Sequence, residues 1–303
     1  MDRFDQLYNN LSKCCPSLEL LKNEPMARHT TFRIGGPVPL MARPATEEQV
    51  VESVKLARES EVPLVVLGNG SNLLVADAGV QAFVLDMTGL SRMERTGERE
   101  ITAGAGVTLA RLAAFAAGEG LAGLEFASGI PGTLGGGVLM NAGAYGGEMV
   151  QVVRRTRCLT PEGMVKEIVG EEHDFSYRHS VFSQGEDVIL SSVLELQPDN
   201  EADIRARMAE LAQKRKTKQP LEYPSAGSMF KRPQGYFAAA LIEQCGLKGF
   251  AVGGAQVSEK HAGFVINRGS ATCGDVLSLV EQVQKRVKEQ TGVELEMEVR
   301  RLG

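Results

Sequence analysis

Apolar residues alternate between helical and strand spacing from about Thr30 onward. Thr46 and Gln49 form a capping box, and the apolar positions 50, 51, 54 and 56–57 behind them predict a helix that runs to about Ser60. The four-residue apolar run at 64–67 then predicts a short buried strand. This alternation of short helices and strands indicates an α+β protein.

The same reasoning places the remaining elements and divides the chain. Pro220 and Pro224 follow a charged helix and mark a hinge between two domains. We therefore expect an N-terminal helix and connector at 1–29, a first domain at 30–200 and a small α+β domain at 201–303. Helices are predicted at 2–13, 46–60, 108–117, 201–218, 236–245 and 274–290, and strands at 64–67, 73–75, 82–86, 99–103, 151–159, 164–169, 186–196, 262–266 and 293–301.

Composition narrows the class of protein. Hydrophobic residues at 43% and charged residues at 23% are typical of a folded globular chain. With 33 basic and 38 acidic residues the net charge is -5, which excludes a strongly basic nucleic-acid-binding surface. An anionic ligand must then be held by local cations. No apolar stretch is long enough to span a membrane, and the start MDRFDQLYNN lacks the pattern of a secretion signal, so we expect a cytoplasmic location.

Cysteine and histidine spacing gives no metal motif. The five cysteines stand at 14, 15, 158, 245 and 273, and the four histidines at 29, 173, 179 and 261. The odd count and scattered spacing indicate reduced structural thiols, with a metal or redox role as the alternative. We predict no metal site.

Glycine is concentrated in one segment. Of the 34 glycines, 18 lie in residues 68–147. The segment contains one G-x-G-x-x-G string, Gly118–Gly123, but it follows a predicted helix, whereas a dinucleotide-binding fingerprint follows a strand. We interpret this string as a helix C-terminal cap and a turn.

Two other glycine clusters suit a nucleotide cofactor better. Leu67–Asn72 (LGNGSN) follows the predicted strand directly and can turn several N–H groups toward an anion. The second cluster, Ala127–Gly137, continues into Asn141–Gly147 and offers hydroxyls and bare backbone. A tight structural loop is the alternative for each cluster alone, but the two in one chain favour a nucleotide cofactor.

Seven sequence strings are characteristic of one protein family. They are TFRIGG at 31–36, GNGSNLL at 68–74, SGIPGTLGGGVLMNAGAYGGE at 128–148, SYRHS at 176–180, SAGSMFKRP at 225–233, KHAGF at 260–264 and EMEVR at 296–300. In these strings and in their order the chain resembles the UDP-N-acetylenolpyruvoylglucosamine reductase family, and the resemblance covers about residues 20–303.

The resemblance implies an FAD-binding domain of the vanillyl-alcohol-oxidase (PCMH) type and a C-terminal substrate domain. The family reduces an enolpyruvyl ether of UDP-N-acetylglucosamine to UDP-N-acetylmuramate for peptidoglycan synthesis, with NADPH as reductant and FAD as hydride carrier. The residues that the resemblance assigns to FAD are Arg33, Gly68, Asn69, Gly70, Ser71, Asn72, Ser128, Gly129, Pro131, Gly132, Thr133, Gly135, Asn141, Gly143 and Ala144.

Three residues match the catalytic positions of the family. Arg178 would bind the carboxylate on which charge develops, and an ion pair with Glu171 or Glu172 is the alternative. Glu298 would stabilise the same charge, most effectively as a hydrogen-bond donor, which requires a raised pKa. Because glutamates alternate in this predicted strand, Glu296 is the fallback. Ser228 would supply the proton.

The substrate contacts are less specific. Lys231, Arg232 and Lys260 are the local cations that we expect at the UDP phosphates, and Tyr177 is a candidate contact or a packing residue. The basic run at 214–218 is interpreted as a solvated helix end, with phosphate binding as the alternative. Only a short turn, Ser183–Asp187, stands where longer members insert a loop with a substrate-binding tyrosine. The chain therefore resembles the shorter type, and we expect a monomer.

Two alternative functions are compatible with the same fold. An oxidase of the same fold would use oxygen as acceptor and often attaches its flavin through histidine, but neither glycine cluster contains a histidine. A sugar-nucleotide binding module without activity would be expected to lack one of Arg178, Ser228 and Glu298, and all three are present.

Overall fold

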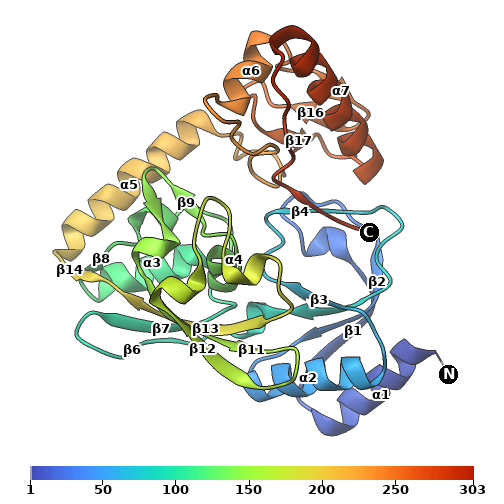
Figure 1. Cartoon of the computed structure of the whole chain (residues 1–303), viewed down its shortest axis with the longest axis vertical. Coiled ribbons are helices and arrows are strands. Elements are labelled where there is room, and N and C mark those ends of the chain that lie inside the picture. The colour runs from blue at the N-terminus through green and yellow to red at the C-terminus, as the bar shows by residue number, and fades with distance from the viewer. Residues whose placement is uncertain (1) are drawn as a thin grey trace. The chain divides into compact units, whose positions relative to one another are not determined.

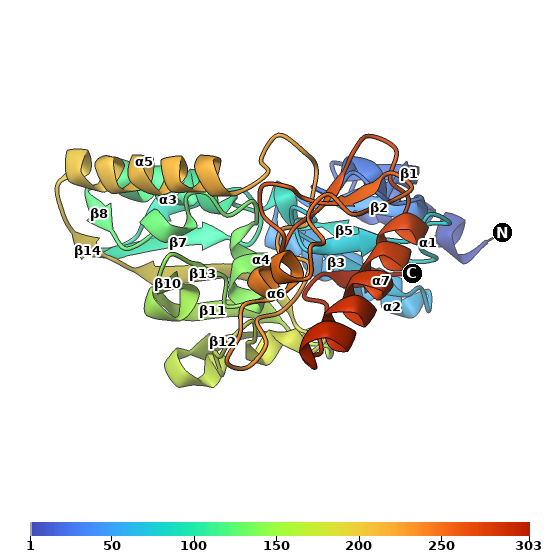
Figure 2. The same ribbon diagram turned by 90° about the horizontal axis from the view of Figure 1, so that it is seen from above.

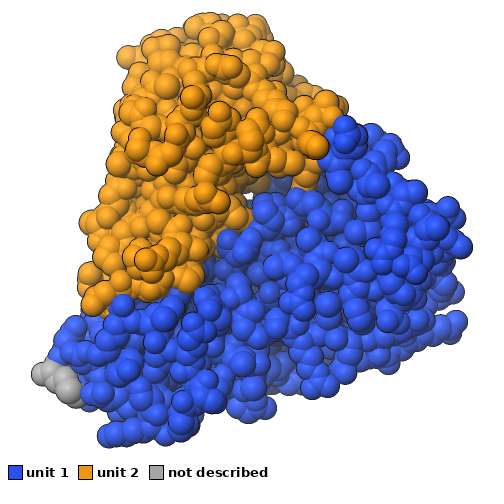
Figure 3. Space-filling view, turned by 180° about the vertical axis from the view of Figure 1, so that it is seen from behind, with its two compact units in different colours: residues 1–22, 40–69, 82–214 blue, residues 23–39, 70–81, 215–303 orange. Residues whose placement is uncertain are grey.

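A computed structural model of the chain describes residues 2–303. These residues form two compact units, and neither unit is one continuous stretch of chain (Figure 3). Unit 1 comprises residues 2–22, 40–69 and 82–214, and unit 2 comprises residues 23–39, 70–81 and 215–303. The predicted division into continuous segments, 1–29, 30–200 and 201–303, stays a prediction.

The first sheet has the strand order β1-β2-β5-β3, in which β5 pairs in parallel with both β2 and β3. Helices α1 and α2 pack against each other beside it (Figure 1). Thr46 caps α2 as predicted, because its hydroxyl accepts from the Gln49 N–H. The elements are α1 (Arg3–Cys14), β1 (Glu19–Pro25), β2 (Pro37–Arg43), α2 (Glu47–Glu59), β3 (Leu64–Leu67) and β5 (Phe83–Asp86).

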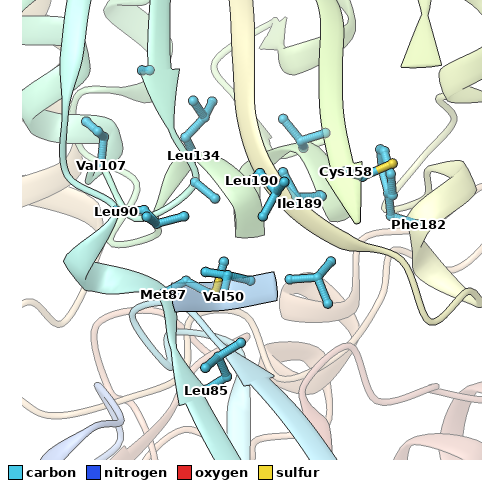
Figure 4. Packing of buried hydrophobic residues seen from close by; sticks show 14 of the residues in the cluster. Val50, Leu85, Met87, Leu90, Val107, Leu134, Cys158, Phe182, Ile189 and Leu190 are labelled. Atoms are coloured by element: carbon cyan, nitrogen blue, oxygen red, sulfur yellow. The ribbon is translucent and has the colours of Figure 1, made fainter. Parts of the chain in front are cut away.

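The second sheet is antiparallel with the order β12-β11-β13-β7-β6. Its central strand β13 is buried along almost its whole length. Figure 4 shows Val50 of α2 and Met87 facing Leu90 and Leu190, so the main core lies between the two sheets. The strands are β6 (Met93–Arg95), β7 (Glu100–Gly104), β11 (Val153–Leu159), β12 (Val165–Val169) and β13 (Val188–Glu195).

Short elements connect and flank these sheets. Helix α3 (Leu109–Gly118) ends where Gly120 adopts φ +67°, so the predicted helix cap at the G-x-G-x-x-G string is confirmed. The end of α3 meets α5 (Glu201–Lys218), where Arg205 lies against Gly118 (Figure 2). The remaining elements here are β8 (Leu121–Ala122), α4 (Leu134–Leu139), β9 (Gly143–Ala144), β10 (Gly147–Glu148) and β14 (Gln197–Pro198).

Unit 2 has its own apolar core. Helix α7 (Cys273–Thr291) packs on a three-stranded antiparallel sheet and is capped by a Thr272–Asp275 capping box. Phe32 and Leu74 complete this core although they come from the first quarter of the chain. The other elements are β4 (Leu73–Val75), α6 (Ala238–Gln244), β15 (Ala251–Val252), β16 (Ala255–Val257), β17 (Val265–Asn267) and β18 (Arg300–Leu302).

Some predicted strands are wrong in extent or burial. Only Arg300 and Arg301 of the predicted strand 293–301 lie in a strand, because the preceding backbone bonds irregularly to residues 229–231. The predicted strand 262–266 lies at Val265–Asn267. Strand β3 is at a sheet edge, which leaves Val66 44% exposed, so the predicted full burial of this run is wrong.

Strands β1 and β2 and helix α4 are among the elements that were not predicted. Strands β1 and β2 contain prolines and polar residues that strands disfavour, so their sequences give little strand signal. Helix α4 has the sequence LGGGVL, and glycine is a poor helix former. Tertiary packing overrides propensity in each case, since Leu134 and Val138 of α4 are fully buried.

Candidate functional site

The two glycine clusters meet in unit 1. The Asn69 side chain donates from Nδ2 to the carbonyl oxygen of Pro131 at 2.6 Å. A Cβ added to Gly68 would come within 2.4 Å of Thr133 Oγ1. The structure therefore brings together four of the residues assigned to FAD, and only glycine fits at position 68 beside the Thr133 hydroxyl.

Thr133 carries a polar atom in need of a partner. Its side chain is 1% exposed, and Oγ1 has no hydrogen-bond partner among the described residues. A buried hydroxyl without a partner costs about 1–3 kcal/mol. The neighbouring Gly136 is exposed, and a Cβ there would meet only Thr133 Oγ1, at 3.7 Å. A ligand rich in phosphate and ring heteroatoms, such as FAD, fits this hydroxyl and the open glycine beside it.

Other glycines of the second cluster are required by protein packing. A Cβ at Gly135 would lie 3.0 Å from Ala105 Cβ, and one at Gly143 would lie 2.7 Å from Glu148 Cγ. Ala144 follows Gly143 in β9, which pairs with β10 through a tight hairpin. Packing within the protein is therefore sufficient to favour glycine at positions 135 and 143.

In the rest of the second cluster, one hydroxyl and one backbone carbonyl form hydrogen bonds within the protein. Ser128 donates from its hydroxyl to the Glu125 carbonyl at 2.8 Å, and the Gly132 carbonyl accepts from Leu109 N at 3.0 Å. Gly129 is exposed. The Ser128 oxygen can still accept a hydrogen bond, but its proton is used within the protein.

Unit 2 contains the second half of the GNGSN motif. Gly70 has φ +56°, and a Cβ there would come within 2.1 Å of the His29 carbonyl oxygen. Its own carbonyl accepts from Thr31 N at 3.3 Å, which joins the motif to the TFRIGG segment. In that segment Arg33 is exposed between two buried side chains and has φ +56°. Ser71 follows Gly70 and is half-buried.

Arg178 lies at the tip of a tight turn in unit 1. Ser176 and His179 exchange backbone hydrogen bonds at 3.2 Å, and Arg178 between them has φ +56°, which is uncommon for a residue other than glycine. Its guanidinium carbon lies 5.0 Å from the centre of the Tyr177 ring. Tyr177 is 51% exposed. A strained residue held in place by its surroundings is characteristic of functional sites.

The turn that carries Arg178 is bonded to the second glycine cluster. The Asn141 side chain donates from Nδ2 to the Ser176 carbonyl at 3.1 Å. On the other side of the turn, the hydroxyls of Ser180 and Ser183 both donate to the Leu139 carbonyl at 2.8 Å. The structure thus connects the predicted carboxylate-binding arginine with the predicted flavin string.

Ser228 and Glu298 come together in unit 2. Glu298 N donates to the Met229 carbonyl at 2.9 Å, and Phe230 forms an isolated bridge with Met297. Ser228 bridges Phe264 on its other side, and Met229 N donates to Gly263 O at 2.8 Å. Three segments far apart in sequence therefore lie side by side, with Ser228 exposed and Glu298 half-buried.

The candidate cations have partners of their own. Lys231 pairs with Glu296, and Lys260 Nζ lies 3.6 Å from a Glu222 carboxylate oxygen. The Arg232 guanidinium carbon lies 4.0 Å from the centre of the Phe237 ring. These side chains are at least partly exposed, so an incoming phosphate could exchange with the carboxylates.

Two histidines are buried and favour the neutral form. Burial lowers the pKa of His173, whose Nδ1 donates to Gly170 O at 2.9 Å and whose Nε2 lies 2.9 Å from Thr156 Oγ1. Burial also lowers the pKa of His261, whose Nδ1 accepts from Gly263 N at 3.2 Å. Gly263 bonds directly to Met229, so His261 supports the segment that carries Ser228.

The sequence left some of these contacts unforeseen. Thr31 Oγ1 donates to the Ser225 carbonyl at 2.8 Å, which ties the TFRIGG segment to the SAGSMFKRP string. Asn72 Nδ2 donates to the Glu298 carbonyl at 3.2 Å. No local pattern signals either contact, because the partners lie 194 and 226 positions apart.

Other site types find no support in the part of the chain that the structure describes. Between residues 2 and 303 no three His, Cys, Asp or Glu side chains gather to hold a metal ion. The five cysteines are free, and burial raises the pKa of Cys158 to about 11. No helix among these residues is long and apolar enough to cross a bilayer.

Two protein-family models match the chain, over two separate ranges of residues. A family model described as an FAD binding domain matches residues 38–169, and one described as the UDP-N-acetylenolpyruvoylglucosamine reductase C-terminal domain matches residues 219–302. The FAD-binding fold is therefore of the predicted type, and the predicted α+β fold class is confirmed.

Relatives match over nearly the full length. The UDP-N-acetylenolpyruvoylglucosamine reductase of Agathobacter rectalis is 50% identical, with 95% of each chain covered. That of Geobacillus thermodenitrificans is 46% identical over 100% of this chain and 99% of its own. The crystal structure of the Thermus caldophilus reductase has a TM-score of 0.80 at 36% identity, covering 94% of this chain and 99% of that one. The chain belongs to the UDP-N-acetylenolpyruvoylglucosamine reductase family and is an FAD-dependent oxidoreductase.

Proposed function

We propose that the protein reduces UDP-N-acetylglucosamine enolpyruvate to UDP-N-acetylmuramate with NADPH, in the supply of peptidoglycan precursors. The observation that supports this best is the pairing of the Ser228 and Glu298 segments through Met229. A proton donor and a charge-stabilising carboxyl group on two segments joined by backbone hydrogen bonds suit addition across an enol ether double bond. NADPH rather than NADH is proposed as the reductant because of the resemblance to the family.

Residues of both glycine clusters would hold FAD. Gly68 and Gly136 leave room beside the buried Thr133 hydroxyl, which would donate to a cofactor oxygen. The resemblance also assigns Gly70, Ser71 and Arg33 to FAD. When bound, FAD would accept hydride from NADPH and pass it to the substrate.

Three side chains carry the remaining chemistry. When hydride adds to the vinyl group, negative charge develops on the adjoining carboxylate. Arg178 can bind that carboxylate with its planar fork of donors, and Glu298, if protonated, can donate a further hydrogen bond. Ser228 then gives its hydroxyl proton to the neighbouring carbon, so hydride and proton together saturate the double bond.

Local cations would hold the nucleotide part of the substrate. Lys231, Arg232 and Lys260 are at least partly exposed in unit 2, and Tyr177 is exposed beside Arg178 in unit 1. Because the net charge of the chain is -5, these groups rather than the overall field would attract a diphosphate. We further propose that the protein works in the cytoplasm as a monomer.

Anaerobic stopped-flow spectroscopy tests this proposal. The purified protein should be yellow, NADPH should bleach its flavin absorbance, and UDP-N-acetylglucosamine enolpyruvate should restore that absorbance without oxygen. A colourless protein after gentle purification would contradict the proposal. Rapid restoration by oxygen but not by the enolpyruvyl substrate would instead identify an oxidase.

A further inference from the structure

The amide groups of Asn72 and Asn141 are engaged with protein backbone. Asn72 lies in GNGSN and Asn141 in the second glycine string, so both positions match flavin-binding motifs. Yet Asn72 Nδ2 donates to the Glu298 carbonyl at 3.2 Å, and Asn141 Nδ2 donates to the Ser176 carbonyl at 3.1 Å. Each amide therefore holds the backbone at or near a predicted catalytic residue.

Asn72 forms two hydrogen bonds to the C-terminal segment, one from its side chain and one to its backbone carbonyl. Besides the side-chain bond to Glu298 O, the Asn72 carbonyl accepts from Arg300 N at 3.0 Å. The next residue begins the parallel pairing of β4 with β18, in which Leu73 stands opposite Arg300. Glu298 itself belongs to the irregular stretch before β18, so sheet pairing alone does not fix it. The Asn72 amide supplies a bond at the Glu298 carbonyl itself.

The Asn141 side chain has its donors fully used. Its Nδ2 donates both to Ser176 O and to Glu148 Oε2, each at 3.1 Å, and its Oδ1 accepts from Val150 N at 3.0 Å. The residue is 1% exposed and has φ +41°, a conformation that asparagine and glycine tolerate best. An amide with both N–H groups engaged has none left to donate to a cofactor.

We propose that Asn72 and Asn141 are positioning residues that hold Glu298 and Arg178, respectively, in the geometry that the substrate half-reaction needs. This inference rests on the proposed function. The Asn72 amide holds Glu298 directly, through a hydrogen bond to the backbone carbonyl of Glu298. The Asn141 amide holds Arg178 indirectly, because it bonds to Ser176, and the two hydrogen bonds between Ser176 and His179 close the turn that carries Arg178. A displacement of about 1 Å of a catalytic group can cost about 10²-fold in rate.

The test separates the two half-reactions in Asn72→Ala and Asn141→Gly. Glycine is chosen at position 141 because it tolerates the positive φ of this residue while the side-chain amide is removed. Both rates are measured on protein saturated with added FAD. In each variant we expect the rate of flavin reoxidation by the enolpyruvyl substrate, relative to the rate of flavin reduction by NADPH, to fall by about 10- to 100-fold.

Matched controls remove an amide–carbonyl bond that lies nearby but holds no catalytic residue. Gln284 Nε2 donates to Leu295 O at 2.8 Å, on the same terminal segment as Glu298. Gln151 Nε2 donates to Gly146 O at 3.3 Å, in the same hairpin region as Asn141. Gln284→Ala and Gln151→Ala should lower the melting temperature about as much as the asparagine variants, without changing the ratio of the two half-reactions.

Three results would overturn the inference. Loss of flavin would make the asparagines cofactor contacts. Equal slowing of both half-reactions, or no change in either, leaves their ratio unchanged and would show that the amides do not position the catalytic residues. An equal change of the half-reaction ratio in the control variants would show that general destabilisation causes the change. If Asn72→Ala lowers folding yield, Asn72→Ser supplies a second variant with a shorter donor. Failure of the wild type to be reoxidised by the substrate would contradict the proposed function instead.

Discussion

The two units supply the predicted site residues by different structural means. In unit 1 the flavin motifs depend on close backbone approach, as at Gly68, and on a buried hydroxyl, that of Thr133. In unit 2 Ser228 is an exposed side chain on a segment that is held by backbone hydrogen bonds on both sides. Substitutions of Gly68 and Thr133 should therefore act through steric fit and cofactor affinity, whereas a substitution of Ser228 should act through the rate of one chemical step.

The largest expected effect is that of Ser228→Ala. Removal of a positioned proton donor should slow flavin reoxidation by the substrate by about 10²- to 10⁴-fold. Flavin reduction by NADPH should be unaffected, because the hydroxyl takes no part in it. Single-turnover stopped-flow measures both rates, and equal loss of both would show that Ser228 has been assigned the wrong role.

Gly68→Ala should affect the cofactor rather than one chemical step. Its Cβ would lie 2.4 Å from Thr133 Oγ1, so either the loop or the Thr133 side chain must move. We expect protein that purifies with little flavin, as measured by the ratio of absorbance at 450 nm to that at 280 nm. Gly118→Ala is the control, since its nearest neighbour is Arg205 at 3.9 Å. Loss of flavin in Gly118→Ala would revive the dinucleotide-fingerprint interpretation.

Thr133→Val tests the orphaned hydroxyl with little change of shape. If the hydroxyl donates to FAD, its loss should weaken FAD binding by about tenfold, or about 1.4 kcal/mol. The apoprotein should be equally stable or more stable, because an unsatisfied buried group has been removed. Ser53 Oγ on α2 is also buried without a partner, so Ser53→Ala is the control. Titration of apoprotein with FAD should separate the two variants.

Acidification should destabilise both units through their buried histidines. Burial lowers the pKa of His173 in unit 1 and of His261 in unit 2 below the ordinary value of 6.5. The unfolded chain therefore binds protons that the folded chain does not, and stability falls as pH drops below 6.5 until the folded pKa is passed. Each histidine contributes at most about 1.4 kcal/mol per pH unit.

Chemical denaturation at pH 7.5 and pH 5.5 measures this loss. His173→Gln should be less stable at the higher pH but should show a smaller difference between the two pH values. An unchanged difference would mean that His173 is not the group responsible in unit 1.

The smallest effect is expected for Glu296→Gln. Glu296 is exposed and pairs with Lys231, and exposed ion pairs contribute about 0–1 kcal/mol. Reoxidation by the substrate should change less than about fivefold, while Glu298→Ala should slow it far more. Equal slowing in both variants would restore Glu296 as the alternative catalytic group.

The sequence predicted the regular elements and the motifs better than the contacts between them. Helices at 201–218 and 274–290 carry clear caps or charge patterns, and both occur at or within one residue of the predicted bounds. The extended stretch 293–301 was misjudged because alternating glutamates suggest a strand, whereas its partner bonds depend on residues 229–231 and Asn72. Alternation along a segment says nothing about which segment will pair with it.

The glycine string shows a second limit of sequence reasoning. A string of bare residues predicts close approach, but not whether the approaching atoms belong to a cofactor or to the protein. Gly135 and Gly143 lie against Ala105 and Glu148, while Gly136 has open space. The presence of α4 within this string also escaped prediction, because its two buried aliphatic side chains outweigh the poor helix propensity of three glycines.

The pairing of β4 with β18 has a consequence for synthesis of the chain. Leu73 stands opposite Arg300, so β4 emerges from the ribosome 227 residues before its partner. At about 5–20 residues per second, that interval lasts roughly 11–45 seconds. Phe32 and Leu74 likewise precede α7, with which they share the core of unit 2. Unit 2 therefore cannot complete its core until the C-terminal part of the chain has been synthesised.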